Sequence, residues 1–406
     1  MKKIIFLISF CGVLISCGDL LNSEIVDSKV SSRSDSFSPK DRQELFPNPL
    51  FIALVDQEDQ AVLQEMIDEN GQYLFDKNRN GDTALAVAIQ FYNLEGALFV
   101  AEQLSPQHLF ETNNQGESYL YLASQQGYVK LIQALSAQFY DSERFAFLSD
   151  YEFSDLDKET LDGERSLHIA KNYVTAEALE YEYWRGLEYP MRKFQYLQNK
   201  EGQTFLHTSI RDQNRDLLFW GVENNCMKKE EWEHQKSYYK YPMFVWKGIQ
   251  KYGKSIHLDW DDVINTQDNQ GMTPVNFAAK NAYLEALDIL STCQWVDYIL
   301  PDHQGNIPLQ NLLLTLNPSN KNHSEEIKKS FTLLMESQTR LTWLGISDQV
   351  NFVNQKGDSS LHIAARFSDP FFYEQLKKYG DREQENHEGH TPKEIFESTR
   401  KHSSLF

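Results

Sequence analysis

The sequence has little that would support catalysis or metal binding. It holds four cysteines in 406 residues, too few for a disulfide framework, and no pair of them has the spacing of a metal site. It contains no phosphate-binding loop, no dinucleotide glycine fingerprint, no Gly-x-Ser-x-Gly nucleophile motif and no His-Glu-x-x-His zinc motif. We therefore expect a protein that is not an enzyme and that uses no cofactor and no metal.

Three short acidic or histidine-containing segments come near a metal or catalytic pattern and then depart from it. Residues 76–81 open like a calcium loop, but Val87 stands where the loop needs a bidentate glutamate. His387 and His390 lie three positions apart without a third ligand, and the acidic residues around Trp260 are typical of a solvated helix start. None of the three is interpreted as a site.

Positive charge is also scarce. Lysine and arginine number 39 against 59 acidic residues, which gives a formal net charge of -20. Such a balance repels nucleic acid and anionic lipid surfaces, keeps a protein soluble and can steer a basic partner toward it.

Long apolar runs are limited to the N-terminus. Lys2 and Lys3 precede an apolar stretch from Ile4 to Ile15, which is shorter than the roughly 20 residues that span a bilayer. This is the layout of a secretory signal peptide. Its ending, Leu14-Ile15-Ser16-Cys17, resembles the lipobox of bacterial lipoproteins.

The lipobox resemblance implies cleavage after residue 16 and attachment of a lipid to Cys17. Two or three acyl chains are enough for stable membrane attachment. Gly18 rather than aspartate follows the cysteine, which favours the outer membrane, facing the periplasm or the surface, over the inner membrane. Residues 17–48, which include a Ser-rich stretch, are predicted to be a lipidated, flexible tether.

The remaining chain, residues 49–406, repeats one pattern of a polar turn with glycine followed by a short apolar helix. The turn glycines are Gly81, Gly116, Gly163, Gly202, Gly271, Gly305, Gly357 and Gly389, and they open windows such as GDTALAVA, GMTPVNFA and GDSSLHIA. A second apolar helix follows the first in residues 123–135 and 278–290. Where the chain has no insertion, the glycines lie 32 to 35 residues apart.

This pattern resembles the ankyrin repeat, whose signature is a turn glycine followed by T-P-L-H-x-A with a period near 33 residues. The resemblance covers roughly residues 50–400 and implies an all-α ankyrin-repeat solenoid of about eight or nine helix-turn-helix repeats with β-turn loops and helical insertions. Residues 51–75 would form a degenerate first pair of helices, and Lys393 replaces the apolar leucine in the last window, as suits a terminal cap. The repeat histidines His168, His207 and His362 would bond backbone near the turns, a structural role.

An insertion near residues 224–262 separates two repeats and is rich in aromatic residues. It contains Trp232, Tyr239 and Trp246, and a smaller aromatic group with Tyr181 precedes it. Two interpretations stay open for these residues. They could form a binding surface, because aromatic residues are enriched in interface hot spots, or they could pack an extra helix against the stack.

The cysteines Cys226 and Cys293 flank this insertion at a separation of 67 residues. Buried free cysteine is common in cores, which favours two separate thiols. Pairing in an oxidising periplasm also stays open.

The ankyrin resemblance implies a monomeric protein that binds another protein on a surface formed by turn tips and first helices. Its expected contacts are Arg79, Asn80, Gln115, Glu201, Gln270, Gln304 and Lys356, together with the insertion residues Trp232, Tyr239 and Trp246. The hypothesis is a lipid-anchored interaction module of the bacterial envelope, which could inhibit or neutralise an envelope enzyme as an immunity protein. The alternative is an envelope scaffold or stress-protection lipoprotein without a single tight partner.

Overall fold

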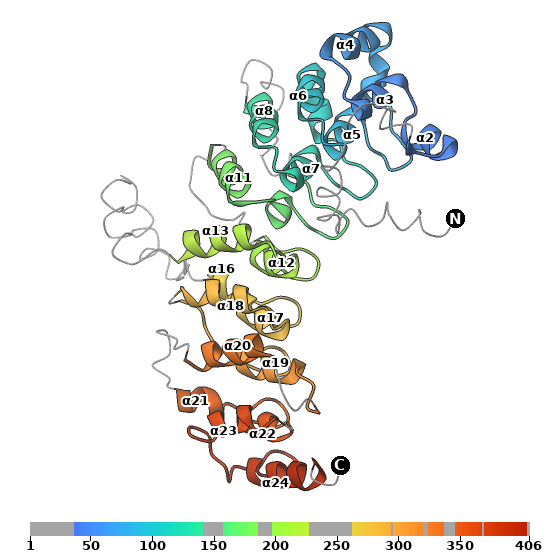
Figure 1. Ribbon diagram of the computed structural model, residues 1–406. Helices are drawn as coiled ribbons and strands as arrows, with labels where there is room; N and C mark the ends of the chain where they lie inside the picture. Colours follow the sequence, from blue (N-terminus) through green and yellow to red (C-terminus); the bar gives the residue numbers. More distant parts are fainter. Residues whose placement is uncertain are drawn as a thin grey trace, which may run out of the picture.

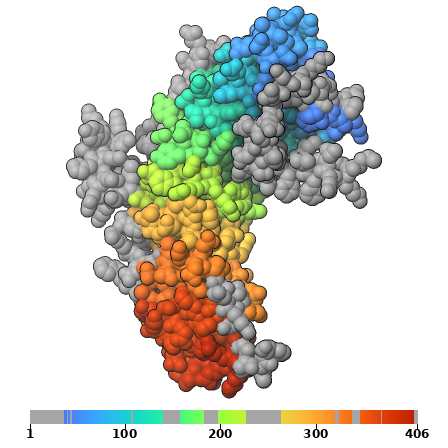
Figure 2. Space-filling model, viewed as in Figure 1, coloured from blue at the N-terminus to red at the C-terminus, as the bar shows by residue number. Residues whose placement is uncertain are grey.

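The computed structural model describes residues 36–140, 157–185, 197–226, 262–293, 295–319, 324–336, 346–367 and 369–403. In these ranges the chain is an all-α ankyrin-type solenoid, with two isolated β-bridges and no strand. Figure 1 shows its helices stacked in sequence order from α2 at one end to α24 at the other, and Figure 2 shows the same stack as one elongated body.

Nine repeat units follow one another in the described ranges, in agreement with the expected eight or nine. Each unit has an inner helix next to the turns and, except in the last unit, an outer helix packed behind it. The inner helices are α3 (Pro49–Asp56), α5 (Ala84–Gln90), α7 (Tyr119–Gln126), η4 (Ser166–Ile169), α12 (Phe205–Arg211), α17 (Pro274–Lys280), α19 (Pro308–Thr315), α22 (Ser360–Ala365) and α24 (Pro392–Ser403).

The outer row runs parallel to the inner row. Its helices are α4 (Gln60–Glu69), α6 (Leu94–Gln103), α8 (Val129–Tyr140), α11 (Tyr173–Arg185), α13 (Arg215–Asn225), α18 (Leu284–Ser291), α20 (Glu325–Glu336) and α23 (Phe371–Leu376). Shorter elements flank the rows: α2 (Pro39–Leu45), η2 (Gly71–Leu74), η3 (Pro106–Phe110), α16 (Asp262–Asn265) and α21 (Ile346–Asn351). Each inner helix contacts the next inner helix, and each outer helix from α4 to α18 contacts the next outer helix.

Burial between repeats explains why such short helices are stable. Most inner helices have six to eight residues, which is too short to persist alone in water. The fourth residue after each turn glycine is buried against the neighbouring repeats in Leu85, Leu120, Leu167, Leu206, Val275, Leu309 and Leu361, all at most 3% exposed. Each such side chain contributes roughly 1.5–3 kcal/mol through burial. In the last unit the same position is Lys393, which is half-buried and lies 3.6 Å from Glu383, as expected of a cap.

The packed body begins earlier than the predicted boundary at residue 49. Residues Pro39–Leu45 form helix α2, and Phe46 is 4% exposed. Phe46 packs edge-on against Phe37 and Phe91, with ring centroids 5.3 and 5.7 Å apart. Aromatic packing thus attaches the end of the predicted tether to the second repeat. The serine-rich composition of this stretch did not indicate that attachment.

The fourth repeat has a shortened inner element. Its inner helix η4 is a single 3-10 turn, whereas the neighbouring α7 and α12 have eight and seven residues. Lys171 follows this turn and donates its backbone N–H to the carbonyl of Ser124, while Asn214 donates to the carbonyl of Ala170. Backbone groups that a longer helix would satisfy are therefore bonded to the repeats on either side.

No helix in the described ranges is long and apolar enough to cross a membrane.

Candidate functional site

Each turn is held by one side chain three residues before its glycine. In the sixth repeat, the carboxylate of Asp268 accepts the backbone N–H groups of Gln270 and Met272 at 2.8 and 2.9 Å. The N–H of Gly271 donates to the carbonyl of Asp268, and Gly271 takes a φ of +76° that a side chain would disfavour. The turn therefore needs an acceptor at its first position and glycine at its fourth.

The same acceptor position recurs in all eight glycine turns, three residues before the sequence windows that begin at each glycine. The residues are Asn78, Asn113, Thr160, Asn199, Asp268, Asp302, Asn354 and Asn386. Short polar side chains that bond the backbone two and four residues ahead are what such a turn requires. Extending the glycine alignment three residues toward the N-terminus shows this position as clearly as the helices that follow.

Backbone bonds join the turns into one continuous row. In the second and third repeats, the N–H of Asn114 donates to the carbonyl of Asn80 at 2.9 Å. Equivalent bonds run from Leu161 to Gln115, Lys200 to Asp162, Asn269 to Glu201, His303 to Gln270, Gln355 to Gln304 and His387 to Lys356. The six residues from Asn80 to Lys356 that the sequence predicts as contacts therefore lie in this row, one per turn.

The side chains of these predicted contacts differ in what surrounds them. Those of Gln115, Glu201, Gln270, Gln304 and Lys356 are exposed, and that of Asn80 is half-buried. The guanidinium of Arg79 instead lies 2.7 Å from Glu44 and 3.6 Å from Asp41, so it is paired with helix α2. The row of turns is thus an exposed polar edge with its first arginine already neutralised.

Polar residues directly behind the first turns form a second, buried row. Asp82 is fully buried and accepts hydrogen bonds from Asn113 and Gln90, both at 3.0 Å. Burial raises the pKa of Glu117, as do the nearby carboxylates of Asp82 and Glu164, although the Asn113 amide opposes them.

The row continues to Glu164, which is 8% exposed. One carboxylate oxygen of Glu164 lies 2.8 Å from the Arg211 guanidinium, and the other accepts the hydroxyl of Tyr121 at 3.1 Å. These two contacts connect the third, fourth and fifth repeats through the buried carboxylate of Glu164.

The three repeat histidines bond backbone, as the sequence predicts. In the fifth repeat, Nδ1 of His207 accepts the N–H of Thr204 at 3.2 Å, so Nε2 carries the proton and donates to the carbonyl of Met272 at 2.9 Å. His168 and His362 make the same two kinds of contact. Burial lowers the pKa of all three imidazoles, that of His207 to about 4. The neutral rings thus bond consecutive repeats to each other.

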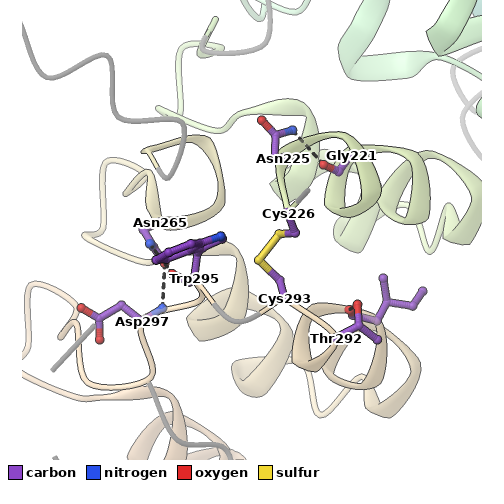
Figure 3. The surroundings of a disulfide bond; sticks show 9 residues. Gly221, Asn225, Cys226, Asn265, Thr292, Cys293, Trp295 and Asp297 are labelled. Atoms are coloured by element: carbon purple, nitrogen blue, oxygen red, sulfur yellow. Dashed lines mark hydrogen bonds between the residues drawn. A yellow bond between two sulfur atoms is a disulfide. The ribbon is translucent and has the colours of Figure 1, made fainter. Parts of the chain in front are cut away.

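The cysteines Cys226 and Cys293 form a disulfide, with Cα atoms 5.3 Å apart (Figure 3). The preference for two separate thiols was therefore wrong. The bond joins the C-terminal ends of the adjacent outer helices α13 and α18, which contact each other. The separation of 67 residues hides this proximity in the sequence, because the proximity depends on α13 and α18 packing as consecutive outer helices.

Both ends of the insertion are fastened to the same short segment. The described part of the fifth repeat ends at Cys226, which is bonded to Cys293, and the next described residues form α16. In α16, Asn265 donates to the carbonyl of Trp295 at 2.9 Å and accepts the N–H of Asp297 at 2.8 Å (Figure 3). The segment 293–297 thus fixes the base of the insertion.

Several predicted site residues lie outside the described residues. These are the lipidation site Cys17 and the insertion residues Trp232, Tyr239 and Trp246. Tyr181, from the first aromatic group, lies on α11 and is 65% exposed. In the described ranges no group of three or more His, Cys, Asp or Glu side chains is placed to hold a metal ion.

Of the comparisons with known proteins, the one with solved structures gave matches. No protein-family model matches the chain, and no curated protein matches it. Among solved structures, the chain is similar to the ankyrin repeat domain of Bcl-3, described as a unique member of the IkappaB protein family. The two share 15% identity over 71% of this chain and 97% of that chain, with a TM-score of 0.42. The repeat contacts within this chain, rather than that similarity, establish its fold.

Proposed function

We propose that this chain is a lipid-anchored, non-catalytic module that binds another protein outside the cytoplasm. The observation that carries the proposal is the disulfide between Cys226 and Cys293. Stable disulfides belong to oxidising compartments and are rare in the cytosol. The N-terminal segment that resembles a lipoprotein signal independently favours export to the same place.

The exposed row of turn tips supports the binding part of the proposal. It offers side chains of Gln115, Glu201, Gln270, Gln304 and Lys356 at regular intervals on a rigid frame of backbone bonds. Because these bonds already fix the backbone of the tips, binding orders only their side chains, which favours recognition of a folded protein surface. The aromatic insertion residues are proposed to add apolar anchors beside them.

A sharper form of the proposal is that the partner is an enzyme active in the envelope, which this chain restrains for self-protection. The alternative is a scaffold with several weak partners. A dedicated inhibitor would form a stable one-to-one complex, whereas a scaffold would recover many proteins in small amounts.

The first test concerns compartment. Cells producing the full chain are treated with a thiol-reactive mass tag before and after reduction, and Cys17→Ala is compared with the native chain. We expect Cys226 and Cys293 to be untagged until reduced, and Cys17→Ala to leave the membrane fraction. Tagging without reduction would contradict export, and an unchanged membrane fraction for the variant would contradict lipidation.

The second test concerns binding. A tagged soluble form that begins after Cys17 is used to capture proteins from the native envelope, beside a variant in which Gln115, Glu201 and Gln270 are all changed to alanine. We expect one dominant stoichiometric partner that the triple variant loses. A scatter of weak partners that the variant keeps would favour the scaffold and contradict the turn-tip interface.

A further inference from the structure

The sequence contains two Asn-Gly pairs, Asn70-Gly71 and Asn80-Gly81. In such a pair the backbone nitrogen of glycine can attack the amide carbon of the asparagine side chain, because glycine has no side chain to hinder the approach. The attack needs a glycine N–H that is not engaged elsewhere and a backbone that can bring the two groups together. The two pairs differ in both respects.

The pair Asn70-Gly71 lies open between α4 and η2. Both residues are exposed, and a Cβ added to Gly71 would meet nothing within 4 Å. The N–H of Gly71 has no hydrogen-bond partner among the described residues. The backbone N–H of Gln72 donates to Oδ1 of Asn70 at 3.1 Å. That bond polarises the side-chain carbonyl and stabilises the negative charge that develops on its oxygen during attack.

The pair Asn80-Gly81 is closed by the row of turns. The N–H of Gly81 donates to the carbonyl of Asn78 at 2.9 Å, and the carbonyl of Asn80 accepts the N–H of Asn114 at 2.9 Å. Gly81 has a φ of +79°, and a Cβ on it would lie 2.8 Å from the backbone nitrogen of Asn114. The nucleophile is therefore engaged, and the backbone around it is held against the next turn.

We propose that Asn70 is a site of spontaneous covalent modification, with water as the co-reactant, and that Asn80 is protected from the same reaction. The nitrogen of Gly71 bonds to Cγ of Asn70, the Cγ–Nδ2 bond breaks, and the proton of the Gly71 N–H leaves with the amide nitrogen as ammonia. Water then opens the cyclic imide at either carbonyl, which gives aspartate or isoaspartate. The proposal does not depend on the lipid anchor or on the turn-tip interface.

The isoaspartate product loosens the first repeat, because its main chain runs through the side-chain methylene and is longer than that of asparagine. The carbonyl of Asn70 accepts the N–H of Tyr73 at 3.1 Å. The carbonyl of Tyr73 accepts the side-chain amide of Asn48, whose oxygen caps α3 by accepting the N–H of Phe51. A longer chain at position 70 displaces η2 and this cap. Since each repeat contacts only its neighbours, the loss of stability begins at the N-terminal end of the stack.

Timed incubation of the full chain at mildly alkaline pH, folded and in urea, tests the contrast between the pairs. Trypsin separates them, because Asn70 falls in the peptide 43–77 and Asn80 in the peptide 80–130. Fragment masses and isoaspartate methyltransferase labelling follow each product. In the folded chain we expect Asn70 to react at least about tenfold faster than Asn80, because the engaged N–H raises the barrier at Asn80. In urea the two rates should agree. Equal rates in the folded chain, or faster reaction at Asn80, would overturn the proposal.

The variant Gly71→Ala supplies a matched control for both the reaction and its consequence. Its methyl group meets nothing in the fold but hinders attack by its own nitrogen, so Asn70 should react at least about tenfold more slowly. After equal incubation, hydrogen exchange in α3 and α4 should be faster in the native chain than in the variant, whereas exchange in α22 and α24 should match. Reaction at Asn70 that is as fast in the variant, or unchanged exchange in α3 and α4 once isoaspartate has formed, would contradict the proposal.

Discussion

Nε2 of His207 donates to the carbonyl oxygen of Met272 at 2.9 Å, across 65 residues of sequence. The bond closes the junction between the fifth and sixth repeats, whose turn glycines Gly202 and Gly271 lie 69 residues apart. The other nitrogen of the same ring accepts the N–H of Thr204. A single neutral imidazole therefore joins a helix start to the next turn, and it can do so only while it is unprotonated at Nδ1.

Stability is expected to fall as pH drops from 7.5 to 5.5, and the repeat histidines give the direction. Burial lowers the folded-state pKa of His168, His207 and His362 below 6.5, that of His207 to about 4. The unfolded chain therefore binds more protons than the folded chain below pH 6.5, and the free energy of unfolding decreases there. The slope is at most about 1.4 kcal/mol per pH unit for each histidine. Urea unfolding at several pH values measures it.

The control for this prediction comes from the chain itself. Gln310 occupies the position of His207 in the seventh repeat, accepting the N–H of Ile307 and donating to the carbonyl of Phe352. We expect His207→Gln to keep most of the stability at pH 7.5 and to show a shallower pH slope. An unchanged slope would mean that His207 does not titrate in this range.

Substitution of turn glycines should separate backbone strain from contact between turns. Gly271 and Gly389 both have a φ of +76°, but a Cβ on Gly271 would lie 2.7 Å from the backbone nitrogen of His303, whereas a Cβ on Gly389 meets nothing within 4 Å. We expect Gly389→Ala to cost about 1–2 kcal/mol from left-handed strain alone. Gly271→Ala should cost more, about 3 kcal/mol or above, because the next turn must move. Chemical unfolding of both variants measures the difference.

Gly71 serves as the control, because it has neither a positive φ nor a neighbouring atom close to the position of a Cβ. Its φ is not positive, and a Cβ on Gly71 would meet nothing within 4 Å, so Gly71→Ala should stay within about 1 kcal/mol of the native chain. Equal losses for Gly271→Ala and Gly389→Ala would contradict the close approach between consecutive turns.

The sequence predicts the regular part of this fold well because two requirements repeat at fixed spacing. The turn needs glycine for its positive φ, and the position four residues later needs an apolar side chain between repeats, as Leu85 and Leu361 illustrate. Both requirements are local, so a single sequence displays them. The exposed turn tips follow from the same alignment, since each precedes its glycine by one residue.

The irregular parts depend on contacts that the alignment does not contain. The window at Gly163 carries the repeat motif, yet its inner helix is one 3-10 turn. The outer helix starts at Tyr173, seven residues after Ser166, whereas ten residues separate the two helix starts Phe205 and Arg215 in the fifth repeat. The pairing of Cys226 with Cys293 depends on two outer helices becoming neighbours across an insertion. The guanidinium of Arg79 is occupied only because α2 extends the stack toward the N-terminus.

Reduction of the disulfide is expected to lower the free energy of unfolding by about 2–4 kcal/mol, since it releases a loop of 67 residues in the unfolded chain. Trp220 is fully buried in the fifth repeat, 5.5 Å from Phe205 between ring centroids. Tryptophan fluorescence with and without reductant should therefore follow unfolding at this junction. The paired variant Cys226→Ala with Cys293→Ala should be equally stable in both conditions. If the free energy of unfolding of the native chain is the same with and without reductant, the bond has no stabilising role.

The ion pair between Arg211 and the buried carboxylate of Glu164 is expected to matter more than a pair in which both side chains are exposed. Arg211 lies 2.8 Å from Glu164, whose side chain is 11% exposed, whereas Arg215 lies 3.1 Å from Glu285 with both side chains at least 45% exposed. Arg211→Ala leaves a buried carboxylate whose remaining side-chain hydrogen bond, among the described residues, comes from the Tyr121 hydroxyl. We expect a loss of about 1–3 kcal/mol, because an unpaired buried charge keeps its desolvation cost.

The matched variant Arg215→Ala should lose about 0.5 kcal/mol or less, since solvent screens an exposed pair. A double-mutant cycle with Glu164→Gln isolates the interaction, because the amide still accepts the Tyr121 hydroxyl while it carries no charge. Most of the Arg211→Ala loss should disappear in the Glu164→Gln background. If the loss is the same in both backgrounds, it arises from the packing of the arginine side chain or from its pair with Asp212, and the buried carboxylate row does not depend on Arg211.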